Sequence, residues 1–173
     1  MKQRTFKLLA LVALLLPQFA AAGGSAYAGW LQSGSMFILT TPEGANLPAG
    51  TSVEEFPVLV RLDKDWFDFT KAKANGEDVR FTTASGAPLA YQIEQWDAAK
   101  GEAVIWVRVP KIEGNARQEI RVHWGKVDAA SESNGKAVFN ETNGYLSVLH
   151  MGDEAKDEAG SVEAKDVGTT ATA

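Results

Sequence analysis

Residues 118–124 read Gln-Glu-Ile-Arg-Val-His-Trp, and polar and apolar side chains alternate along them. The apolar side chains occupy every second position: Ile120, Val122 and Trp124. The positions between them are polar: Glu119, Arg121 and His123. Because successive side chains of a β-strand point to opposite faces of the sheet, this period of two predicts a strand with one buried face. We expect that face to bury Trp124, and Gly125 to end the strand.

Similar short segments lie on either side of this one, separated by clusters of Gly, Pro, Asn and Asp. The expected strands are residues 36–41, 56–62, 79–83, 89–94 and 103–109. Residues 103–109 are apolar on both faces apart from Arg108, which predicts a central strand that is covered on both sides. Pro110 should terminate it, since proline cannot donate to a strand ladder.

Residues 65–74 do not alternate, and we expect a helical turn there, near Phe67 and Phe69. No segment between Gly29 and Phe139 keeps a helical period of 3.6 residues. The sequence therefore predicts an all-β fold, an antiparallel β-sandwich of the jelly-roll or immunoglobulin-like kind, over residues 29–139.

Residues 1–28 have the organisation of a secretory signal peptide, with a basic start, an apolar run at 8–16 and small residues at the end. We expect cleavage after Ala28, with Ala22 as the alternative. The apolar run is too short to cross a bilayer comfortably. The mature chain should therefore be exported to the periplasm, the cell envelope or the extracellular space, without a membrane span.

The composition excludes several classes of site. The 173 residues include no cysteine, which rules out disulfides, thiolate metal sites and a thiol nucleophile. The net charge is −5, and removal of residues 1–28 leaves 14 basic against 22 acidic residues, or −8. An acidic chain of this kind is a poor partner for nucleic acid, which is bound by clustered Lys and Arg. We expect no cofactor.

The composition of the sequence changes after Phe139. Residues 140–144 are a turn-rich joint, and residues 145–151 predict one more strand. Residues 152–173 are acidic, small and polar, and a lone strand followed by such a stretch cannot bury itself. Residues 140–173 are therefore either a disordered acidic tail or, as we favour, a linker and the truncated start of a second, incomplete β unit.

No segment carries a recognisable catalytic or metal motif. The acidic run from Asp63 to Asp68 fails the EF-hand pattern, because Phe67 stands at the fifth position and Ala74 at the twelfth. His123 and His150 have no metal-ligand spacing. Asp78 and Glu94 could hydrolyse a glycosidic bond if they faced each other, but a structural Asp–Arg pair at the strand start is the better interpretation. We therefore predict no enzymatic activity.

Exposed tryptophans offer the best candidate for ligand binding, since they can stack on the apolar faces of sugar rings. Trp96 follows Glu94 on the face opposite Tyr91 and Ile93, which makes it the best exposed candidate, although we favour packing as the explanation even for this residue. The predicted ligand-binding residues are Trp96, Glu94, Trp66, Asp78 and Arg80.

Four runs of sequence resemble a known family in their order. They are Phe-Pro-Val-Leu-Val-Arg-Leu at 56–62, Gly-Glu-Asp-Val-Arg-Phe at 76–81, Leu-Ala-Tyr-Gln-Ile-Glu-Gln-Trp-Asp at 89–97 and Ile-Trp-Val-Arg-Val-Pro at 105–110. This order resembles a bacterial domain of unknown function, family 2341, found in secreted and envelope proteins. The last strand of such domains ends in tyrosine and glycine, where this chain has Trp124 and Gly125.

The resemblance implies context rather than activity. Such domains often precede a concanavalin-A-like lectin or glucanase module, and residues 143–151 and 157–161 look like its opening. Some occur in proteins that continue into a MotA/TolQ/ExbB proton-channel domain. The family supplies no catalytic residues to transfer.

Three functional hypotheses follow. The first is a non-catalytic, exported β-sandwich module of a larger envelope protein that binds a glycan or a protein partner. The second is the extracytoplasmic head of a MotA/TolQ/ExbB-type proton-channel protein. The third, much weaker, is a glycan hydrolase using Asp78 and Glu94.

Overall fold

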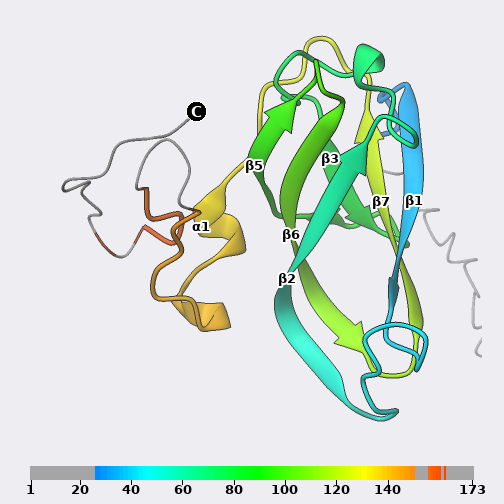
Figure 1. Cartoon of the computed structure of the whole chain (residues 1–173), viewed down its shortest axis with the longest axis vertical. Coiled ribbons are helices and arrows are strands. Elements are labelled where there is room, and N and C mark those ends of the chain that lie inside the picture. Colours follow the sequence, from blue (N-terminus) through cyan, green and yellow to red (C-terminus); the bar gives the residue numbers. More distant parts are fainter. Residues whose placement is uncertain (1–25, 151–155, 161, 163–173) are drawn as a thin grey trace, which may run out of the picture.

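A computed structural model describes residues 26–150, 156–160 and 162. It is a sandwich of two antiparallel sheets (Figure 1). The strands are β1 (Gln32–Leu39), β2 (Ser52–Asp63), β3 (Arg80–Thr83), β4 (Pro88–Leu89), β5 (Tyr91–Asp97), β6 (Glu102–Glu113) and β7 (Arg117–Trp124). The predicted all-β sandwich is confirmed. The predicted signal peptide lies outside the described residues, except for residues 26–28.

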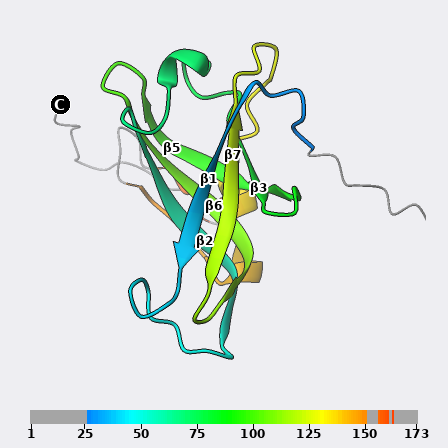
Figure 2. The ribbon, with the colours of Figure 1, turned by 90° about the vertical axis from the view of Figure 1, so that its right-hand side faces the viewer.

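The two sheets differ in size. One has the strand order β1-β7-β3-β4 and the other the order β2-β6-β5. Figure 2 shows β1 and β7 side by side on one face of the sandwich, with their register running from Gln32 opposite Trp124 to Leu39 opposite Arg117. The chain changes sheets at Ala90, which separates β4 from β5. The expected strand at 89–94 is thus two strands in different layers.

The core lies between the sheets and follows the predicted alternation. From the first sheet Phe81, Ile120 and Val122 point inward, and Trp124 is also buried, as predicted. From the second sheet the inward side chains are Val60, Leu62, Ala103, Ile105, Val107 and Val109. The expected helical turn is a single 3-10 turn at Phe69–Lys71, and it places Phe67 and Phe69 against the upper end of this core.

Pro110 does not end β6, so that prediction was wrong. The N–H of Arg108 donates to Ala90 O, on the β5 side, and by the two-residue period the nitrogen of Pro110 faces the same way. Pairing with β5 ends at Val107, so Pro110 removes no ladder hydrogen bond. Glu55, opposite Pro110 on β2, adopts a left-handed φ of 51°. The inward face shifts at this bend, from Val109 to Ile112.

The outer face of β6 is covered by residues 134–150 and 156–160, and Figure 1 shows α1 beside β5 and β6. This segment contains the short helix α1 (Gly135–Val138) and a 3-10 turn at Glu141–Asn143. Val138 and Phe139 are buried, and their cluster packs against Trp106 of β6. The prediction that β6 is covered on both sides is therefore confirmed.

The strand predicted at 145–151 does not form. Over residues 145–150 the structure contains an isolated bridge between Leu149 and Asp157. The apolar side chains of this stretch do not build a second sheet, because Tyr145 and Val148 pack against the cluster of Val138 and Phe139 on the sandwich. The start of a lectin-like module stays a prediction, and Met151 lies outside the described residues.

We predict that Phe139→Ala destabilises the protein by about 3 kcal/mol, because it removes a buried aromatic side chain that contacts Trp106 and Tyr145. Urea denaturation measures the change in the free energy of unfolding. Leu146→Ala, at an exposed position of the same segment, should change it by less than about 0.5 kcal/mol. Equal effects of the two variants would contradict the packing described.

Candidate functional site

The five predicted ligand-binding residues do not converge on one site. Asp78 and Arg80 are buried beside the start of β3, and Glu94 lies on the outer face of the opposite sheet. Trp96 packs against the core, and Trp66 stands exposed in the loop after β2. Each therefore has to be judged by its own contacts.

Asp78 is 1% exposed, and backbone N–H groups occupy its carboxylate. Oδ1 accepts from the N–H of Lys73 at 2.9 Å. Oδ2 accepts from the N–H groups of Gly125 and Lys126 at 2.7 and 3.0 Å. A buried carboxylate is stable when its oxygens are hydrogen-bonded in this way. Asp78 thus ties the loop before β3 to the end of β7, and the predicted Asp–Arg pair is replaced by these backbone contacts.

The side chain of Arg80 is also occupied by contacts within the protein. Its guanidinium donates to Val79 O at 2.7 Å, to Ala130 O at 2.6 Å and to the hydroxyl of Tyr91 at 3.0 Å. Its Nε lies 3.1 Å from a carboxylate oxygen of Glu132. Arg80 therefore clamps residues 130–132 onto the sandwich and crosses from one sheet to the other. Neither Asp78 nor Arg80 is open to a ligand.

Trp96 packs against the core, as the favoured interpretation held, although the face predicted for it was the outer one. The register of β5 against β6 shifts between Ile93 and Gln95, which leaves Glu94 as an extra residue. A β-bulge of this kind turns every later side chain to the other face. Trp96 therefore joins Tyr91 and Ile93 on the inner face, where its ring lies 5.1 Å from Phe69 and 5.9 Å from Phe67.

Glu94 belongs to a polar cluster on the outer face of β5 and β6. Its carboxylate accepts from the indole Nε1 of Trp106 at 2.6 Å and lies 3.5 Å from Nδ1 of His150. The other ring nitrogen of His150 lies 3.1 Å from Gln92 Oε1, and its ring stacks on Trp106. These contacts attach the C-terminal segment to the sheet. Glu94 and Asp78 share no contact, so the structure does not assemble the carboxylate pair of a hydrolase.

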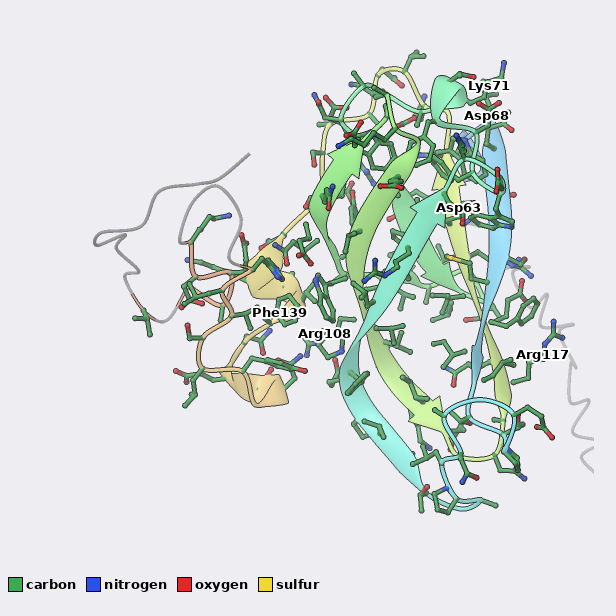
Figure 3. All side chains as sticks on the ribbon, in the orientation of Figure 1. Asp63, Asp68, Lys71, Arg108, Arg117 and Phe139 are labelled. Atoms are coloured by element: carbon green, nitrogen blue, oxygen red, sulfur yellow. The ribbon has the colours of Figure 1, made fainter. Side chains whose placement is uncertain are left out.

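Trp66 is the most exposed of the five tryptophans, at 46%. It borders a hollow of about 450 Å³ at the end of the sandwich where Figure 3 shows Asp63, Asp68 and Lys71. Polar side chains share its lining with Trp66: Lys64, Asp65, Asp68, Thr70 and Lys100. The rest of the lining includes the short turn at 98–101. Aromatic surface and hydrogen-bonding groups therefore meet at one concave place.

A second hollow, of about 430 Å³, lies on the outer face of β1 and β7, and sequence reasoning missed it. Its lining combines two aromatic residues with polar strand residues: Tyr27, Trp30, Ser33, Ser35, Arg121 and His123. Asp78 O holds the indole Nε1 of Trp30 at 2.6 Å, and Tyr27 packs edge-on against that ring. Cleavage after Ala28 removes Tyr27 from this hollow, whereas cleavage after Ala22 keeps it.

Two further observations concern ions and membranes. Within residues 26–150, 156–160 and 162, no group of three or more histidine or carboxylate side chains is arranged to hold a metal ion. In the same part of the chain, no helix has the length and the apolar character that crossing a bilayer requires.

We predict that Asp78→Ala destabilises the fold by about 3 kcal/mol, because it leaves buried N–H groups of Lys73, Gly125 and Lys126 without an acceptor. Thermal and urea denaturation measure the change. The matched control is Asp65→Ala, since Asp65 is exposed. Wild-type stability of Asp78→Ala would contradict a structural role for this carboxylate.

A second prediction concerns alkaline pH. Burial raises the pKa of Tyr91 to about 12 from its ordinary value near 10. Between these values the unfolded chain loses the phenolic proton while the folded chain keeps it, so the free energy of unfolding falls as pH rises. We expect a loss of about 2–3 kcal/mol from this group across that interval.

Urea denaturation at intervals of pH, compared with Tyr91→Phe, isolates the contribution of Tyr91. The variant lacks the phenolic proton and should lose correspondingly less stability above pH 10. An equally steep loss in the variant would show that other groups cause it.

Residues 75–146 match the model of a family described as Domain of unknown function (DUF2341). No curated protein matches the chain, and no solved structure does. The matched residues run from the loop before β3 through the turn at Glu141–Asn143, and so include Asp78, Arg80, Glu94 and Trp96. The resemblance predicted from the sequence motifs is therefore confirmed over residues 75–146, which match the model of this domain of unknown function.

Proposed function

We propose that this chain is a non-catalytic, exported β-sandwich module of a larger cell-envelope protein, and that it binds a glycan at the hollow beside Trp66. The observation that carries the proposal is the exposed ring of Trp66 at the border of a concave, polar-lined site. Export rests on the signal-peptide pattern of residues 1–28.

Neighbouring residues hold the ring of Trp66 in place, as a surface for stacking requires. The ring packs directly against Gly34, so closely that a Cβ atom at position 34 would lie 2.7 Å from Cζ2 of Trp66. Phe67, which is buried, lies 6.5 Å away between ring centroids and connects the platform to the core. One part of the indole is thus held by the protein while the other part stays open. A sugar ring presents an apolar face that stacks on such a surface.

The side chains around Trp66 suit the hydroxyl groups of a sugar. The carboxylate of Asp68 accepts from the N–H and the hydroxyl of Thr70, which fixes its direction. These hydrogen bonds hold the pKa of Asp68 below its ordinary value, so the group is an acceptor at neutral pH. Lys100, which also lines the hollow, is paired with Asp97 at 3.0 Å and provides N–H donors. Donors and acceptors around one aromatic ring favour a polyhydroxylated ligand over an apolar one.

The contacts of the Asp78 and Glu94 carboxylates support the non-catalytic part of the proposal. Asp78 is occupied by backbone N–H groups, and Glu94 by Trp106 and the segment that carries His150. Hydrolysis of a glycosidic bond needs two carboxyl groups that flank one open position. No observation favours the proton-channel head over the binding module.

We predict that wild-type protein binds at least one polysaccharide fragment on a broad glycan array, and that Trp66→Ala weakens that binding tenfold or more. Loss of one stacking platform of about 1.5 kcal/mol corresponds to such a factor. Isothermal titration calorimetry with the sugar identified on the array measures it. Trp66→Phe keeps an aromatic face and should retain part of the affinity.

Val127→Ala is the matched control, since Val127 is exposed outside this hollow and should leave binding unchanged. Absence of binding by the wild type across the array, or equal affinities of wild type and Trp66→Ala, would show that Trp66 does not serve a glycan.

A further inference from the structure

The two sheets of the sandwich have four edges, and three of them are blocked against pairing with another strand. β4 has two residues. β5 is covered by residues 133–134, since Asn134 N–H donates to Tyr91 O and the hydroxyl of Ser133 accepts from Ile93 N–H. β2 carries Pro57 together with charged residues, and Glu55 O accepts from the side chain of Asn143.

Within residues 26–150, 156–160 and 162, the fourth edge, β1, has none of these protections. Its sequence, Gln-Ser-Gly-Ser-Met-Phe-Ile-Leu, contains no charge and no proline. Natural proteins blunt long edge strands with lysine, proline, bulges or a covering segment. An uncharged edge strand of this kind is therefore a surface on which another strand can pair.

The backbone direction shows which groups are open. Thr40 N–H donates to Ala116 O, so residue 40 and every second residue before it face β7. The N–H and C=O groups of Ser33, Ser35 and Phe37 consequently point away from the sheet. Among the described residues they have no backbone partner. Leu39 O is already taken by Ala45 N–H, so the open part of the edge ends before Leu39.

The side chains of β1 are complementary in size to those of a second β1. The first half of the strand carries the small residues Ser33, Gly34 and Ser35, and the second half, residues 36–39, carries large apolar side chains. Phe37 is 43% exposed on the outer face, and the guanidinium of Arg117 lies 3.5 Å from its ring centroid. Ser33 and Ser35 line the hollow of about 430 Å³ on the same face. An antiparallel copy of β1 brings its large half onto this small half.

We propose that two copies of this chain associate by antiparallel pairing of β1 with β1, centred on Ser35. In this register Ser33 lies opposite the partner's Phe37, and the aromatic ring enters the hollow beside Ser33 and Ser35. Directly opposite residues on one face have Cβ atoms about 5 Å apart, which allows that contact. The four-stranded sheets of the two copies then form one continuous sheet across a two-fold axis.

A second copy fits this edge better than an unrelated strand. The open groups, the exposed Phe37 and the hollow that receives it all lie on β1 and its outer face, so one surface supplies both halves of the interface. A two-fold interface requires this self-complementarity. The edge also offers no charge with which to select a charged partner segment.

Sedimentation velocity of the purified protein between about 1 μM and 1 mM tests the association. Phe37→Lys should raise the dimer dissociation constant at least tenfold. Leu59→Lys is the matched control, since Leu59 is similarly exposed on the outer face of the other sheet, and it should not change the constant. The double variant Ser33→Asp with Phe37→Lys should restore association. In the proposed register, the lysine introduced at position 37 lies opposite the aspartate introduced at position 33 of the partner, and the two opposite charges attract each other.

Cross-linking tests the register independently of stability. The chain contains no cysteine, so Ser35→Cys places a single thiol at the two-fold axis. Mild oxidation should give a covalent dimer from Ser35→Cys and little from Leu59→Cys. A wild type that is monomeric at 1 mM, a dimer that Phe37→Lys leaves intact, or equal cross-linking of the two cysteine variants would each overturn the proposal.

Discussion

The double burial of β6 is the constraint on which the rest of the structure depends. This strand is apolar on both faces, so both of its faces have to be buried by packing against other segments. The larger sheet covers the inner face, with Phe81 and Val122 against Ile105 and Val107. The segment around Phe139 covers the outer face at Trp106. The C-terminal segment is thus a third layer of the fold rather than an appendage to it.

Charged residues then attach the connecting loops to these layers. Asp78 binds backbone N–H groups at the end of β7, and Arg80 binds the backbone carbonyl of Ala130 and, across the sandwich, the hydroxyl of Tyr91. Buried charges of this type are costly unless they are paired. Backbone N–H groups bind the carboxylate of Asp78, and Nε of Arg80, which makes no hydrogen bond, lies 3.1 Å from the carboxylate of Glu132. Residues that look reactive in the sequence are therefore the ones that hold the loops in place. The open hollows on the surface combine aromatic rings with polar and charged side chains, an arrangement that suits ligand binding.

Of the two tryptophans predicted to bind a ligand, Trp66 is exposed and Trp96 packs against the core, and a single residue accounts for the position of Trp96. The alternation of β5 places Trp96 outside, but the extra residue Glu94 reverses the face of everything after it. A bulge depends on the partner strand and leaves no local signature. Pro110 is a similar case: the general rule against proline in a ladder does not apply where the neighbouring strand has already ended.

The amino-acid sequence alone determined most of the strands, their buried faces at β6 and β7, the short turn near Phe69 and the motifs shared with the family whose model matches residues 75–146. It did not show that residues 89–94 divide between two sheets or that residues 145–150 form no strand. When one face of a strand is buried, apolar and polar residues alternate along it with a period of two. This pattern lies in neighbouring residues, so the strand can be predicted without knowing its distant contacts. The tertiary structure decided which segment covers Trp106, which groups bind Asp78 and which edge stays open. Those contacts join residues dozens of positions apart, and their formation depends on how whole layers pack rather than on any local pattern.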